Sequence, residues 1–241
     1  MRLVPSAVLL LLLIAPLRAE ETVKDALVPE AERVRVLQRV GEKCAQVRDL
    51  TADFEQRSLR EGLKEPVVSR GTLLYRVDPQ SGAELLLKVT EPEKSFIRVT
   101  RLRMETYLPE DRQVEIIDLK EDEAGARAVD ATVLLYGKPR EYWEAHFEVE
   151  VPAKAGVDDP DELRLVPKDG ELRRRILEIR MWVAAETALP VRVRYRYARG
   201  EEVTMEFGRV KPNTGLTARD LAPVYPKDTE ILRPGGEPEK P

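Results

Sequence analysis

Residues 71–89 read GTLLYRVDPQSGAELLLKV, and this stretch decides the fold class. Two apolar runs, 71–77 and 85–89, flank the turn sequence Asp78-Pro79-Gln80-Ser81-Gly82. Such a pattern is typical of two antiparallel strands joined by a turn. Both runs carry apolar side chains at consecutive positions, as in Leu85-Leu86-Leu87, so apolar groups point to both faces. One face should pack on the core of the sheet, and the other must be covered by a helix or lie open.

Similar runs, separated by turn residues, recur about every ten residues along the chain, which is the cadence of an antiparallel meander. We expect one twisted sheet of about ten strands, which tends to curl at that size. In the run 176–183, alternation predicts that Leu177, Ile179, Met181 and Val183 share one side. The predicted strands lie at 50–60, 67–77, 85–89, 96–99, 104–108, 114–119, 147–151, 163–166, 176–183, 191–197 and 203–207.

Helices interrupt the strand pattern at two places. Residues 29–47 predict a helix of about five turns, with one apolar stripe and a charged opposite face. Residues 129–136 predict a short helix stopped by Gly137 and Pro139, and 141–144 predict a second short turn. The fold class is therefore α+β, mainly β, with helices that lie on one face of the sheet. Their apolar stripes act either as a lid over a binding face or as the ordinary cover of a core.

The N-terminus has the three-part build of a secretory signal peptide. Arg2 precedes the apolar run 8–14, and a break at 15–19 offers cleavage after Ala19. The alternative is an uncleaved anchor helix. We therefore expect a signal peptide over 1–19, a folded domain over 20–224 and a flexible tail over 225–241. The expected location is the periplasm, where the cleaved protein is soluble.

Charge argues against a nucleic-acid partner. The formal net charge of the 241-residue chain is -4, from 40 basic and 44 acidic residues. Loss of Arg2 and Arg18 with the signal peptide lowers it to -6. A mildly acidic protein is a poor general binder of nucleic acid. The basic stretch 173–175 and the ladder Arg192, Arg194 and Arg196 remain as local exceptions.

Two interpretations of the arginine ladder are open. It is either a solvated outer face with cross-strand acidic partners, or a docking face for an acidic partner or anionic lipid headgroups. Acidic residues available as partners are Glu178, Glu202 and Glu206.

The sequence offers little catalytic chemistry. There is one histidine, His146, and one cysteine, Cys44, and no Cys-x-x-Cys, His-Glu-x-x-His or glycine-rich phosphate loop. Cys44 lies on the apolar stripe of the first helix, which favours a buried structural thiol over a Cys-His catalytic pair. The acidic residues Asp118 and 121–123 read as a solvated loop. We expect no enzyme, no cofactor and no metal site.

Six short segments follow one another in order between Val36 and Val224. They are 50–56 (LTADFEQ), 69–76 (SRGTLLYR), 91–93 (EPE), 107–109 (YLP), 163–168 (LRLVPK) and 207–213 (FGRVKPN). In this order and spacing the chain resembles the LolA-like superfamily of periplasmic lipoprotein carriers, as a divergent relative.

The resemblance implies an incomplete β-barrel with a helical lid, whose concave apolar face holds the acyl chains of a lipoprotein or a related lipid. It also implies an inner-membrane exporter and an outer-membrane acceptor as partners, a monomeric carrier and no nucleotide. The residues expected to line the apolar face are Leu73, Tyr75, Leu85, Leu87, Ile97, Val99, Met181 and Val193.

The chain departs from the family pattern in the lid latch. Carriers of the family place an Arg-Pro pair after the second strand, and Arg76 stands near that place but is followed by Val77. Arg76 is therefore the candidate latch. Two other functions stay open: an envelope sensor of the same fold, which usually has a second C-terminal domain, and a hydrolase of envelope polymers.

Overall fold

The computed structural model describes residues 26–78, 82–119, 136, 138–154, 156 and 159–233. The expected signal peptide over 1–19 and all of the expected helix 129–136 except Tyr136 lie outside these residues. No helix in the described part combines the length and the apolar character needed to cross a membrane.

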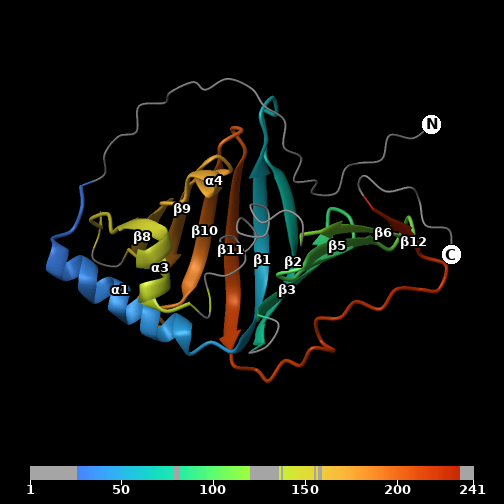
Figure 1. The fold of residues 1–241 in the computed structure, drawn as a ribbon, viewed down its shortest axis with the longest axis horizontal. Helices are drawn as coiled ribbons and strands as arrows, with labels where there is room; N and C mark the ends of the chain where they lie inside the picture. Colours follow the sequence, from blue (N-terminus) through green and yellow to red (C-terminus); the bar gives the residue numbers. More distant parts are fainter. Residues whose placement is uncertain are drawn as a thin grey trace.

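In the described residues, twelve strands form a single open, curved sheet (Figure 1), in the order β12-β6-β5-β4-β3-β2-β1-β11-β10-β9-β8-β7. All neighbours pair antiparallel except β12, which runs parallel to β6. The expected curled, mainly antiparallel sheet is thereby confirmed. The strands are β1 Asp49–Leu59, β2 Val67–Asp78, β3 Gly82–Glu91, β4 Ser95–Val99, β5 Arg103–Leu108, β6 Gln113–Asp118, β7 Phe147–Glu150, β8 Asp161–Pro167, β9 Ile176–Val183, β10 Pro190–Tyr197, β11 Glu202–Pro212 and β12 Glu230–Leu232.

Three helices are described, and two of them lie together on one face of the sheet. Helix α1 (Glu30–Ala45) has acids in its first turn and Lys43 in its last, as the helix dipole favours. Helix α3 (Arg140–His146) packs beside α1, over the β8–β11 half of the sheet (Figure 1). Helix α1 matches the predicted helix 29–47, and α3 is longer than the short turn predicted at 141–144. The short α4 (Gly170–Arg173) is capped by the Asp169 side chain.

The face of the sheet that α1 and α3 cover, here called the inner face, carries the main core. The stripe of α1 contributes Val36, Leu37, Val40 and Cys44, all buried against the strands. Fully burying one such aliphatic side chain stabilises the fold by about 1.5–3 kcal/mol. The stripe predicted from the sequence is thus the contact that holds α1 on the sheet.

The phase of β9 differs from the prediction at its first residues. Ile179, Met181 and Val183 lie in the inner core as expected, but Leu177 is 37% exposed and Ile176 is buried in its place. The pairing with β10 shifts between Arg196 and Tyr197, which exchanges the two faces at this end of the strand. Periodicity along one strand cannot reveal such a shift.

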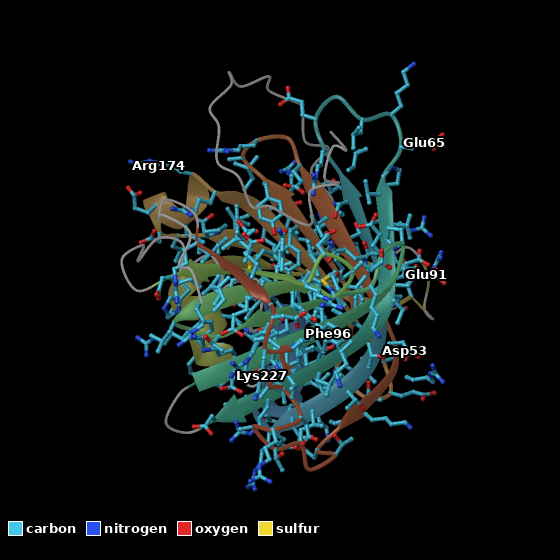
Figure 2. All side chains as sticks on the ribbon, turned by 90° about the vertical axis from the view of Figure 1, so that its right-hand side faces the viewer. Asp53, Glu65, Glu91, Phe96, Arg174 and Lys227 are labelled. Atoms are coloured by element: carbon cyan, nitrogen blue, oxygen red, sulfur yellow. The ribbon has the colours of Figure 1, made fainter. Side chains whose placement is uncertain are left out.

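The opposite, outer face of β2–β6 is covered by the segment 213–229, here called the C-terminal strap. Leu221 of the strap is buried against Leu74 and Leu86, and Tyr225 packs on Tyr107. The strap runs from the end of β11 to β12 (Figure 1), and Figure 2 labels Lys227 on it. Residues 225–233 were expected in a flexible tail, yet 230–232 form β12 on the edge of β6. The remainder of the expected tail, 234–241, lies outside the described residues.

Asp49 fixes the start of the strap. Its carboxylate is buried and accepts hydrogen bonds from Thr214 N (2.6 Å), Thr214 Oγ1 (2.8 Å) and Gly215 N (3.1 Å). Asn213, which precedes them, adopts a left-handed backbone conformation with φ 57°. Asn tolerates that conformation better than most residues. The carboxylate therefore ties the turn after β11 to the first residue of β1.

We predict that Asp49→Ala lowers the free energy of unfolding by about 2–3 kcal/mol, because three donors of the strap lose the charged acceptor that they share. Urea denaturation monitored by circular dichroism measures the change. Asp53→Ala is the matched control, since Asp53 lies on the same strand but its side chain is 40% exposed and pairs with Arg209. Its loss should cost less than about 1 kcal/mol, and equal losses for both variants would contradict the anchoring role.

Candidate ligand-binding face

The eight residues predicted to line an apolar site all lie on the inner face, buried in one continuous core. Strand register explains why they share that face. Leu73 and Tyr75 of β2 stand opposite Leu87 and Leu85 of β3, and cross-strand partners point to the same side. The remaining four are Ile97 and Val99 on β4, opposite β3, and Met181 and Val193, which pair between β9 and β10.

The eight predicted residues therefore fall into two groups, one on β2–β4 and one on β9–β10, with β1 and β11 between them. Their role as a ligand lining remains a prediction.

Tyr136 links these two groups, and sequence reasoning missed this role. Its carbonyl oxygen accepts a 2.6 Å hydrogen bond from the Tyr75 hydroxyl on β2. Its own hydroxyl donates to Pro190 O at the start of β10, 2.7 Å away. The ring lies 6.3 Å from that of Phe207. The only signal in the sequence was an aromatic residue at the end of the predicted helix 129–136, which did not indicate where the ring would insert.

Trp143 brings an unpaired polar atom into the same core. The side chain is 1% exposed and packs under α3, and its indole Nε1 has no hydrogen-bond partner among the described residues. A buried donor without an acceptor costs about 1–3 kcal/mol. Such a group favours any ligand that brings a carbonyl oxygen to it.

The candidate latch residue Arg76 lies on the outer face, because its neighbour Tyr75 points inward. Its guanidinium pairs with Asp78 and lies 3.8 Å from Glu84 of β3. These contacts join two strands of the sheet. They place Arg76 on the side away from α1 and α3, so the described part of the chain shows no bond from Arg76 to either helix.

The arginine ladder on β10 has the acidic partners expected from the sequence. Its ion pairs are Arg192–Glu206 at 3.1 Å, Arg194–Glu202 at 3.9 Å and Arg196–Glu178 at 3.8 Å. Two of these guanidinium groups also lie over the Trp182 ring, at 5.2 Å and 5.8 Å. The expected cross-strand acidic partners of the ladder are thereby confirmed.

Glu178 is the centre of that outer face. Burial alone would raise the pKa of its carboxyl, but hydrogen bonds from Arg164 and Arg180 outweigh burial and hold the pKa below its ordinary value. A carboxyl with a lowered pKa stabilises the fold above its unfolded-state pKa, and the contribution is lost as the pH falls through the folded-state value. The network is therefore structural at neutral pH.

Cys44 and His146 do not have the properties of a catalytic pair. Burial raises the pKa of the Cys44 thiol to about 12, so the thiol stays protonated at neutral pH. His146 is exposed, its Nδ1 lies 2.8 Å from Tyr142 O, and its ring stacks on Tyr142. Within the described ranges, no group of three or more His, Cys, Asp or Glu side chains could hold a metal ion.

No family model matches this chain, and no curated protein matches it in sequence. Among solved structures, a putative outer membrane lipoprotein-sorting protein domain from Vibrio parahaemolyticus is similar to this chain. The two share 13% identity over 78% of this chain and 97% of that one, with a TM-score of 0.45. A LolA superfamily protein from Nitrosomonas europaea shares 13% identity over 78% and 97%, with a TM-score of 0.39.

A third structure, the Pseudomonas aeruginosa MucA/MucB complex, contains a chain with 13% identity and a TM-score of 0.42. The match covers 80% of this chain but only 61% of that one. These solved structures are similar to this chain in fold. At these identities the similarity concerns the fold alone.

The first prediction here concerns Cys44. Because the thiol is buried and its pKa is raised to about 12, we expect no reaction with N-ethylmaleimide in the native protein at pH 7–8 and full reaction in denaturant. Mass spectrometry counts the adducts. A Cys44→Ala, Val224→Cys variant is the positive control, since Val224 is 89% exposed. Rapid native labelling of Cys44 would revive the catalytic interpretation.

The second prediction concerns Tyr136. Tyr136→Phe leaves Pro190 O without its buried donor, and should lower the free energy of unfolding by about 1–3 kcal/mol in urea denaturation. Tyr107→Phe is the control, because that ring packs on Phe96 and Tyr225 while its hydroxyl makes no hydrogen bond among the described residues. We expect a change below about 0.5 kcal/mol for the control. A neutral effect of Tyr136→Phe would refute the bridging role.

Proposed function

We propose that this protein is an exported, periplasmic carrier that binds the acyl chains of lipoproteins or related lipids on the inner face of its sheet. The observation that carries the proposal is the placement of all eight predicted lining residues on one face of the sheet, within one core. A plain structural domain would show the same burial, so binding itself has to be measured.

The physical argument rests on apolar area. Transfer of one methylene from water into an apolar site contributes about 0.8 kcal/mol, so a long acyl chain gains on the order of 10 kcal/mol. The inner face presents leucine, isoleucine, valine and methionine side chains, which can accept such a chain without specific geometry. Because these side chains are already packed, the acyl chain must replace contacts made by the covering segments.

Polar groups within the core suit an acylated ligand. An acyl ester or amide carries a carbonyl oxygen, and Trp143 Nε1, which has no partner in the described part of the chain, is a donor in the same apolar surroundings. Tyr136 lies at the end of the segment expected to form the lid, and among the described residues two hydrogen bonds and ring packing hold it. In this proposal Tyr136 leaves the sheet when the ligand enters.

The proposed route follows from the same chemistry. An acylated molecule cannot cross the aqueous periplasm unshielded, so the carrier would receive it from an inner-membrane exporter and pass it to an outer-membrane acceptor. The carrier would work as a monomer and without a cofactor.

The proposal is tested by native mass spectrometry of protein purified from a bacterial periplasm, followed by lipid extraction. We expect copurified lipid or acylated peptide, or uptake of an added diacylated peptide. A clean apo mass with no uptake would refute the carrier function and leave a closed structural or sensor domain.

The location of the ligand is tested with a diazirine-bearing fatty acid. Photolysis and peptide mapping should place adducts on Leu85 and Leu87, which face inward, and not on Leu86 between them, which faces the strap. Leu86 thus serves as the control for Leu85 and Leu87 in the unmodified protein, so no destabilising substitution is needed. Adducts confined to the outer face would contradict the proposed site even if lipid binds.

A further inference from the structure

A pocket of about 650 Å³ opens outside the inner-face core, between α1 and the start of β8. Its volume is within the range of small-molecule sites. Most of its lining is charged, unlike the inner face. The lining residues are Glu32, Arg35, Val36, Arg39, Lys154, Gly156 and Asp161.

The acidic side chain at the centre of this pocket is already neutralised. Asp161 is 10% exposed and pairs with Arg39 from α1 and with Lys154, whose Nζ lies 3.0 Å from it. Arg39 also donates to Ala185 O at 3.0 Å, which fixes its guanidinium in place. Two cations therefore converge on one carboxylate and leave a positive charge there.

The second acidic residue is paired as well. Glu32 and Arg35 form a 2.8 Å ion pair one turn apart on α1, and the Arg35 side chain is 74% exposed. The lining holds three cationic and two anionic side chains, so its net charge is one positive. Arg35 can turn from Glu32 toward a ligand at little cost, because exposed ion pairs are worth about 0–1 kcal/mol.

We propose that this pocket binds a singly charged phosphate oxyanion, such as the phosphodiester of a lipid headgroup. One negative charge neutralises the pocket, whereas a dianion would leave an excess of negative charge beside Asp161. Guanidinium groups suit phosphate oxygens because they donate two parallel hydrogen bonds. The ammonium group of Lys154 adds a third donor from another segment.

The pocket stands apart from the proposed acyl-binding face, yet the two share α1. Val36 lines the pocket and also packs in the inner core. If the proposed function holds, an amphiphile could place its acyl chains under α1 and its headgroup in the pocket. If that function fails, the oxyanion site still stands on its own charges.

The test is titration calorimetry of the full mature chain at low ionic strength with dimethyl phosphate and with dihexanoylphosphatidylglycerol. Arg35→Gln should weaken binding of both about threefold, and Glu32→Gln should strengthen it by a similar factor. Added salt should weaken binding, since the pocket is open to solvent.

The chain offers matched controls. Arg174 and Glu171 form the same type of ion pair one turn apart, and the Arg174 side chain is 75% exposed. Arg174 is the C-cap residue of α4, which lies apart from α1 (Figure 1), and it does not line the pocket. Arg174→Gln and Glu171→Gln should leave both dissociation constants unchanged.

Inorganic phosphate identifies the source of the anion. If it competes with dimethyl phosphate, the pocket is a free-phosphate site; if it does not compete, the pocket is a headgroup site. Failure of both phosphodiesters to bind, or equal effects of pocket and control variants, would overturn the proposal. Octyl glucoside, which is uncharged, reports the acyl-binding face separately. Binding of octyl glucoside with no effect of Arg35→Gln on the phosphodiesters would retain the carrier function and reject the oxyanion pocket.

Discussion

The structure depends on a sheet whose central strands are apolar on both faces. In β2, Leu73 and Tyr75 point inward while Leu74 points outward, and β3 repeats the pattern with Leu86 outward. Backbone alternation makes this unavoidable once three apolar residues stand in a row. Each face then needs its own cover. The strap supplies it on the outer face of these strands, and α1 packs on the inner face over the β8–β11 half.

The two halves of the outer face meet solvent in different ways. Over β2–β6 the strap excludes water, and Glu105 is buried there, within 3.7 Å of Arg98 and bonded to the Tyr225 hydroxyl at 2.8 Å. Over β8–β11 no described segment plays the part of the strap, and charged side chains pair across neighbouring strands around Glu178. Ion-paired charged side chains can stay partly exposed to water at little cost, whereas an exposed leucine patch needs a cover. The distribution of Leu74, Leu86 and Glu178 therefore decides which half carries a strap.

Local patterns in the sequence predicted what depends on local physics. The stripe of α1, the antiparallel pair β2–β3 and the ladder on β10 follow from spacing and alternation alone, and the structure confirms them. The missed features depend on contacts distant in sequence. Pairing of 230–232 with β6 joins segments more than a hundred residues apart, the shift at Ile176 needs the β10 register, and the pocket around Asp161 forms only when α1 meets β8.

Helix α1 is the element on which the inner face and the pocket both depend. One side of the helix holds Val36, Leu37 and Val40 against the sheet, and its edge holds Arg35 and Arg39 at the pocket. A rigid helix of 16 residues cannot move one side without the other. Displacement of its stripe by an acyl chain would shift Arg39 away from Asp161, and an anion held by Arg39 would resist that shift. Binding at the two proposed sites would thus be coupled through α1. The sign of the coupling free energy depends on whether one ligand supplies both the acyl chain and the charge or two ligands supply them separately.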